Sequence, residues 1–323
     1  MSWRALLRFI SVAALFAIVS HLLVALAAVG VLHRLYPHRI FDVRSFSDNP
    51  VEGFRLIGTY LNENARHQVA PVVVVAGSSV SYGYLWPERV TFARLFADAR
   101  PSAKVLNVSI VAADVSAVND WIVCAARRNQ IRVDSLIVEL PVVNTLSYLV
   151  TTHRSGHAPS PLSTCEEFPR DPGYFRFAVT KIRGSGWIRL FWAGQTYERG
   201  ERQIRIESVP KGYFASAEDF ESVRGGFAAQ ISATLTRAQS VADRVYAFPS
   251  PVFVPGLAEV GEDAAAIRQQ LDAALAACRS VPGVGCIDSS GLYDGRSFYS
   301  NLTHLNQAGH RAMAALLDRQ IPQ

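Results

Sequence analysis

The sequence predicts a three-layer α/β/α sandwich built on a five-stranded parallel sheet, together with one N-terminal transmembrane helix. Five short apolar runs are separated by longer segments with apolar residues at helical spacing, a pattern typical of strands linked by crossover helices. The runs are continuously apolar, as in strands covered on both faces of a sheet. One long uncharged stretch lies apart from them, near the N-terminus.

The uncharged stretch covers residues 9–32. Its 24 residues form a helix long enough to cross a hydrocarbon core about 30 Å thick. We therefore assign residues 1–35 as a transmembrane anchor. A cleaved signal peptide is the alternative, because Ala25-Leu26-Ala27 resembles a cleavage site. We favour the anchor because the apolar stretch continues beyond that site.

Residues 36–70 are interrupted by Pro37 and Pro50, and we predict that they form a juxtamembrane stalk leading to a folded domain at 71–323. Each predicted strand of this domain is bounded by Gly, Pro, Asn or Asp, which commonly end strands. The predicted strands are residues 72–76, 104–108, 135–140, 244–248 and 284–287.

Helices are predicted between and after the strands, because the apolar residues of these segments fall on one helical face. Residues 145–209 do not fit the alternation, since they are rich in Pro, Gly, Arg and aromatic residues. We predict an insertion there, with a short helix at 175–182. The other predicted helices are residues 88–99, 114–130, 217–242, 263–279 and 307–319.

Composition narrows the classes of function. The formal net charge of +5 is spread along the chain without a dense basic block, so nucleic-acid binding is not expected. No histidine pair has metal-ligand spacing on a recognisable element, and we predict neither a metal nor another cofactor. Cys278 and Cys286 flank a Pro-Gly turn, where a disulfide would suit an oxidising compartment. Four buried thiols are the alternative.

Polar residues follow the predicted strands at their carboxyl ends, where open α/β sheets bind ligands. Ser78 and Ser79 follow the first strand, Asn144 the third and His304 the fifth. A serine hydroxyl becomes an effective nucleophile when a base lies within hydrogen-bond distance and fixed donors stabilise the oxyanion. The sequence therefore predicts a serine-histidine site at this edge of the sheet.

Two segments resemble sequence blocks of the SGNH (GDSL-type) hydrolase superfamily. Gly77-Ser78-Ser79-Val80 is similar to the Gly-Asp-Ser-Leu block, in which the serine two places after the glycine is the nucleophile. Asn301-Leu302-Thr303-His304-Leu305-Asn306 is similar to the last block, Asp-x-x-His-Leu-Asn, whose histidine is the base. The resemblance spans residues 72–323 apart from the insertion, and it implies that Ser79 is the nucleophile and His304 the base.

The resemblance also implies an oxyanion hole. Its donors would be the backbone N–H of Ser79, the backbone N–H of Ala112, where the family has a glycine, and the side chain of Asn144, which is displaced by one position from the family's asparagine. A backbone donor survives the change from glycine, although alanine is less free in φ and ψ.

The last block departs from the family at Asn301, where the family has an aspartate. An asparagine can orient His304 but cannot stabilise its cationic form. Three interpretations follow: a Ser79–His304 dyad, another acid such as Asp288 or Asp294, or an inactive site.

From the resemblance we expect a serine esterase or O-acyltransferase that forms an acyl-serine intermediate on an O-acyl ester, with an acetylated cell-envelope or secreted glycan as substrate. The implied partners are the membrane, through the N-terminal helix, and a membrane-bound O-acyltransferase, with the domain on the extracytoplasmic (periplasmic) side. The alternative is a non-catalytic accessory domain that binds a glycan or such an acyltransferase.

Overall fold

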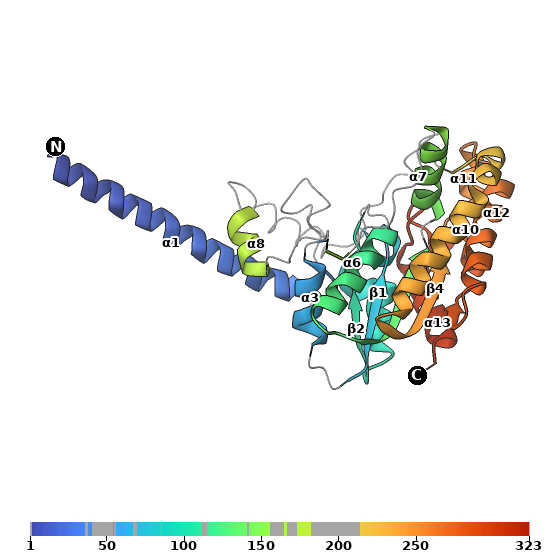
Figure 1. The fold of residues 1–323 in the computed structure, drawn as a ribbon, viewed down its shortest axis with the longest axis horizontal. Helices are drawn as coiled ribbons and strands as arrows, with labels where there is room; N and C mark the ends of the chain where they lie inside the picture. The colour runs from blue at the N-terminus through green and yellow to red at the C-terminus, as the bar shows by residue number, and fades with distance from the viewer. Residues whose placement is uncertain are drawn as a thin grey trace.

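In a computed structural model of the protein, the five predicted strands form one parallel sheet in the order β2-β1-β3-β4-β5, with helices on both faces (Figure 1). The predicted fold class is thereby confirmed. The strands are β1 (Val72–Ala76), β2 (Lys104–Asn107), β3 (Val133–Leu140), β4 (Ala242–Pro249) and β5 (Val284–Cys286). The structure describes residues 2–35, 38–40, 54, 56–66, 70–84, 86–111, 115–140, 142–155, 165–166, 173–181 and 214–322.

β3 is the central strand and pairs with β1 on one side and β4 on the other. Every residue of β1 and all but one of β3 are buried, which explains the continuously apolar sequence of β1 and of residues 136–138 in β3. Because all strands are parallel, the segments that follow β1, β3 and β4 meet at one edge of the sheet.

Two layers of helices enclose the sheet (Figure 1). On one face α5 (Phe92–Asp98) packs against α13 (Gln307–Gln320). On the other, α10 (Ala217–Gln239) contacts α6 (Val115–Arg128), α7 (Val142–Arg154) and α12 (Ala264–Arg279). The starts of α10, α12 and α13 are marked in the sequence by capping residues, whose side chains accept first-turn N–H groups. These residues are Ser216, Asp263 and Asn306.

Two helical segments differ from the sequence prediction. The helix predicted at 88–99 is divided into a 3₁₀ turn, η2 (Glu88–Val90), and α5, because the Thr91 side chain caps α5 by accepting the N–H of Arg94. Residues 142–154, largely assigned to the insertion, form the regular helix α7. Within the rest of the insertion, α8 (Tyr174–Lys181) matches the short helix predicted there, and residues 156–164, 167–172 and 182–209 lie outside the described residues.

The N-terminal helix α1 (Trp3–Leu35) projects away from the sheet (Figure 1). Its segment Trp3–Gly30 has a mean hydropathy of 2.6 and is long and apolar enough to cross a membrane. Its large apolar side chains up to Leu26 are mostly exposed. α1 also packs against α8, where His21 Nε2 lies 2.7 Å from the carbonyl oxygen of Val179. An apolar helix exposed on most sides suits a lipid environment, a property shared by anchors and signal sequences.

The described parts of the predicted stalk contact the domain. Ile40 N donates to Asn107 O, and Asn107 N donates to His38 O, both at 2.8 Å, so residues 38–40 continue the sheet beside β2. The helix α3 (Ile57–Ala65) packs on α6 and buries Leu61 completely. Over its described residues, this segment contributes to the core of the domain.

Two disulfide bonds join the four cysteines. Cys278–Cys286 closes the loop between α12 and β5, as the flanking Pro-Gly turn indicated. Cys124, on α6, is bonded to Cys165 of the insertion, a pairing that nothing in the local sequence predicted. Four free thiols are therefore not the state of this chain. Such bonds form and persist in oxidising compartments.

Candidate active site

The first half of the site is a sharp turn between β1 and the short helix α4 (Ser79–Tyr82). Gly77 permits the turn, because a Cβ at this position would collide with Ser81 Oγ and Glu139 Oε2. Ser78 is extended, and α4 begins at the next residue. As a result Ser78 is buried, whereas Ser79 is partly exposed. Of the two neighbouring serines, Ser79 presents the accessible hydroxyl.

The second half is the loop that precedes α13. Tyr299 and Leu305 form an antiparallel bridge, and Ser300 N donates to His304 O at 3.0 Å, so the loop closes on itself. His304 Nε2 lies 2.9 Å from Ser79 Oγ, within hydrogen-bond distance. The structure therefore brings together the serine and the histidine that the sequence placed at one edge of the sheet.

Asn301 lies on the other side of the imidazole. Its Oδ1 accepts the backbone N–H groups of Thr303 (2.9 Å) and His304 (2.7 Å), which fixes the oxygen as the inward-facing amide atom. The same oxygen lies 3.1 Å from His304 Nδ1. Because Asn301 Oδ1 can only accept, Nδ1 must carry the proton and Nε2 is left as the acceptor for the Ser79 hydroxyl. Asn301 thus selects the tautomer that a general base requires.

Neither of the alternative acids contacts the histidine. Asp288 accepts the backbone N–H of Ser290 at 2.9 Å, and Asp294 is paired with Arg268. Within the described part of the chain, the side-chain partners of His304 Nδ1 are Asn301 and Thr303, whose Oγ1 is 3.2 Å away. Of the interpretations that the sequence left open, the one with Asp288 or Asp294 behind the imidazole is not the arrangement of this structure.

The imidazole of His304 is neutral at neutral pH. Although His304 as a whole residue is partly exposed, desolvation by the surrounding protein lowers the pKa of its imidazole from 6.5 to about 4. A neutral Nε2 can take a proton from a serine hydroxyl, whereas a protonated one cannot. The same desolvation makes the imidazolium formed during such a transfer costly, and Asn301 supplies no charge to offset it.

The pKa of His304 sets the expected pH dependence. The basic form is present above a pKa of about 4, so kcat/KM for an ester is expected to be level from neutral pH down to about 5. Below about 4 it should fall roughly tenfold per pH unit. The measurement is a pH–rate profile with samples returned to pH 7 to check that acid exposure is reversible. An acid limb near 6.5 would contradict a desolvated base.

Of the three predicted oxyanion donors, the structure describes Ser79 fully, Asn144 only in its backbone, and Ala112 not at all. Among the described residues, no acceptor receives the backbone N–H of Ser79, so it is available to a ligand. Ala112 lies outside the described residues. Asn144 lies on α7, immediately after the end of β3, but its side chain is outside the described part of the structure. Ala112 and Asn144 therefore stay predictions.

A pocket with an empty volume of about 460 Å³ opens beside Ser79. Pockets that are mainly apolar with a few polar groups commonly bind small ligands and orient them. Here four polar residues, the nucleophile candidate Ser79 among them, line the pocket together with six apolar residues. The polar lining is Ser78, Ser79, Ser250 and Thr303, and the apolar lining is Val80, Val142, Val143, Phe214, Val252 and Leu271.

Two buried charged residues support the turn that carries Ser79, residues 77–82, which we call the nucleophile turn. Neither residue was predicted from the sequence. Glu139, at the end of β3, is fully buried and accepts hydrogen bonds from Ser78 and Ser81. Arg39 is also buried and donates to the carbonyl oxygens of Tyr82 and Trp86, both at 3.2 Å. Glu139 could have been found from the sequence, because it is a carboxylate within a mostly apolar strand. No sequence feature indicated a role for Arg39.

Comparisons with known proteins yield similar structures but no matching sequence. No family model matches the chain, and neither does a curated protein. A member of the lipolytic G-D-S-L family from Veillonella parvula has a TM-score of 0.43 and 9% identity, with 77% of this chain and 97% of that chain covered. An extracellular lipase from Streptomyces rimosus has a TM-score of 0.43 and 11% identity, with 78% and 100% covered. A salicylyl-acyltransferase from a tetracycline biosynthetic pathway has a TM-score of 0.35 and 13% identity, with 79% and 55% covered.

Proposed function

We propose that this chain is a membrane-anchored serine esterase or O-acyltransferase of the SGNH type. One observation carries the proposal: His304 Nε2 lies 2.9 Å from Ser79 Oγ while His304 Nδ1 faces Asn301 Oδ1. A nucleophile, a base and a residue that orients the base are the parts that serine acyl transfer needs. In this proposal Ser79 attacks, His304 moves the proton and Asn301 orients His304.

The proposed reaction proceeds in two halves. Ser79 Oγ attacks the ester carbonyl carbon while His304 Nε2 takes the hydroxyl proton, and the Ser79 N–H stabilises the oxyanion. Collapse of the tetrahedral intermediate breaks the ester C–O bond, the imidazolium returns the proton to the leaving oxygen, and an acyl-Ser79 remains. Water or a sugar hydroxyl then attacks this acyl group with His304 again as the base, which restores Ser79. Water gives a hydrolase and a sugar hydroxyl gives a transferase.

We further propose that the substrate is an acetylated cell-envelope or secreted glycan and that the domain faces the extracytoplasmic side. Two features support this placement: the long apolar helix α1, which would hold the domain at the membrane surface, and the two disulfide bonds, which suit an oxidising compartment. A membrane-bound O-acyltransferase is the proposed partner, as the donor of the acyl group.

Trapping of the acyl-enzyme tests the proposal. The full chain in detergent is incubated with p-nitrophenyl acetate, quenched in acid and digested, and the peptide containing Ser79 is examined by mass spectrometry. We expect one acetyl group on Ser79 that disappears when water or a glycan hydroxyl is allowed to react. If folded protein releases no p-nitrophenolate above the uncatalysed rate and Ser79 stays unmodified, the proposal fails in favour of a non-catalytic accessory domain, the alternative that the asparagine at position 301 suggests.

A further inference from the structure

Glu139 makes four hydrogen bonds, three of them to the nucleophile turn. Its Oε2 accepts the backbone N–H groups of Ser78 (3.0 Å) and Ser81 (2.9 Å). Its Oε1 accepts the hydroxyl groups of Ser78 and Ser250, each at 2.6 Å. The two backbone groups can only donate, so the side chain meets them as an acceptor. All four contacts come from residues that surround Ser79.

These contacts hold the turn on both sides of the nucleophile. Ser78 immediately precedes Ser79, and Ser81 follows it by two residues, so one carboxylate fixes both flanks. Glu139 projects from β3, which pairs directly with β1, and Ser250 follows β4 on the other side of β3. The carboxylate therefore ties the turn after β1 to the segment after β4 at the edge of the sheet where His304 arrives.

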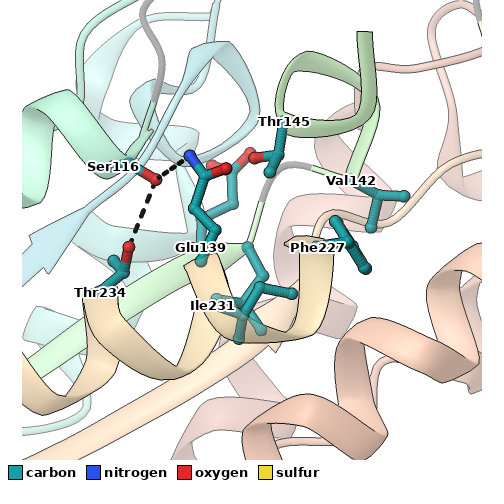
Figure 2. A pocket seen from close by; sticks show the side chains of 9 residues that line it. Ser116, Glu139, Val142, Thr145, Phe227, Ile231 and Thr234 are labelled. Carbon is teal, nitrogen blue, oxygen red and sulfur yellow. Dashed lines mark hydrogen bonds between the residues drawn. The ribbon is translucent and has the colours of Figure 1, made fainter. Parts of the chain in front are cut away.

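The turn is held by this carboxylate in addition to the packing of Val80 and Tyr82 in the apolar core. A cavity with an empty volume of about 290 Å³ lies on the other side of Glu139, between β3, α7 and α10 (Figure 2). The side chains of Ser116, Thr145 and Thr234 line it together with Glu139.

Burying the Glu139 carboxylate lowers the stability of the fold unless its contacts compensate for the loss of hydration. Burying a charge costs several kcal/mol unless it is well hydrogen-bonded, and no cation pairs with Glu139 among the described residues. The neighbouring β3 residues Leu136, Ile137, Val138 and Leu140 are apolar and are buried without this cost. What the carboxylate provides, and an apolar side chain cannot, is a fixed position for the residues around Ser79.

We propose that Glu139 is a positioning residue for Ser79, which holds the Ser79 hydroxyl at hydrogen-bond distance from His304. The inference rests on the proposed function, since it concerns the reactivity of Ser79. It predicts a loss in the rate of reaction at Ser79 with little change in the binding of the reagent, because Glu139 does not line the pocket beside Ser79.

The test compares Glu139→Met with Glu139→Gln in the full chain. A glutamine keeps the four contacts if its oxygen accepts the two backbone N–H groups and its amide nitrogen donates to the rotated hydroxyls of Ser78 and Ser250. A methionine keeps the length but makes none of them. Thr234→Val is the matched control, because Thr234 lines the same cavity and bonds to Ser116, away from the turn.

The readout is the rate at which a fluorophosphonate labels Ser79, measured over a range of probe concentrations. We expect the limiting rate to fall roughly 10- to 100-fold in Glu139→Met, as for the loss of charge-assisted hydrogen bonds, with half-saturation changed by less than about twofold. Glu139→Gln should recover most of the rate, and Thr234→Val should match the wild type.

The outcomes separate the two proposals. If the wild type labels and folded Glu139→Met labels at the same limiting rate, Glu139 only stabilises the fold and the inference is overturned while the proposed function stands. The inference is also overturned, and the proposed function again stands, if Glu139→Met changes the half-saturation concentration of the probe but not the limiting rate. If folded wild type does not label at all, the proposed function fails and the inference fails with it. Folding is checked by circular dichroism and by the unfolding midpoint of each variant.

Discussion

Ser79→Ala and His304→Gln are each expected to lower kcat for ester hydrolysis by at least roughly a thousandfold. Alanine removes the nucleophile, and glutamine removes the only base within reach of Ser79 Oγ among the described residues. Serine and histidine act as a unit, so the double variant should be no slower than either single variant. The measurement is steady-state hydrolysis of p-nitrophenyl acetate by the full chain, corrected for the uncatalysed rate.

Ser81→Ala is the matched control for Ser79→Ala. Both serines lie on α4, and Ser81 Oγ is buried without a hydrogen-bond partner in the described structure. Removing an unpartnered buried hydroxyl is close to neutral for stability, and the Ser81 backbone N–H that binds Glu139 is retained. Ser81→Ala should therefore keep the wild-type rate. Equal losses in the two alanine variants, or losses that add in the double variant, would argue against Ser79 and His304 as one catalytic unit.

The sheet was predictable because its signal is local. β1 is a short run buried on both faces of the sheet, and such burial favours an apolar residue at every position, so this strand was located to the residue. The helices with side-chain caps were located nearly as well, since Ser216, Asp263 and Asn306 mark their starts. By contrast, α7 was missed because it begins directly after Pro141 and most of its residues belong to the segment 145–209, whose composition resembles a loop.

The contacts around the nucleophile turn could not be predicted, because they join distant parts of the chain. Their position after the strands, together with the resemblance of two segments to SGNH blocks, was enough to select Ser79 and His304, which are in contact in the structure. Glu139 reaches Ser78 across two paired strands, and Arg39 reaches Tyr82 from a segment near the anchor. Sequence patterns report which residues are buried, whereas these roles depend on which buried polar group faces which donor.

The same distinction applies to Asn301. In the sequence, Asn301 stands where the similar SGNH block has an aspartate, and the only consequence that can be inferred is the loss of the aspartate's negative charge. In the structure, two backbone N–H groups orient its amide so that Oδ1 faces His304 Nδ1. The contact that would orient the imidazole is therefore present, whereas Asn301 supplies no negative charge that would stabilise a protonated imidazole.

Asn301→Asp is accordingly expected to increase activity. A carboxylate oxygen can accept the same two backbone N–H groups and the Nδ1 proton, and the Asn301 amide nitrogen donates to none of the described residues, so the change removes no hydrogen bond. In serine proteases the reverse change costs about 10⁴-fold because the histidine adopts the wrong tautomer. Here the tautomer is already correct, so we expect a smaller gain, about 10- to 100-fold in kcat/KM.

The pH–rate profile shows whether that gain has the proposed cause. A carboxylate beside His304 favours the imidazolium, so the pKa of His304 should rise from about 4 and move the acid limb of kcat/KM to higher pH. Asn301→Ala is the companion variant: it removes the orienting oxygen without adding charge and should lower the rate. A gain with an unmoved acid limb, or no gain in a folded Asn301→Asp variant, would show that the charge behind His304 does not limit this site.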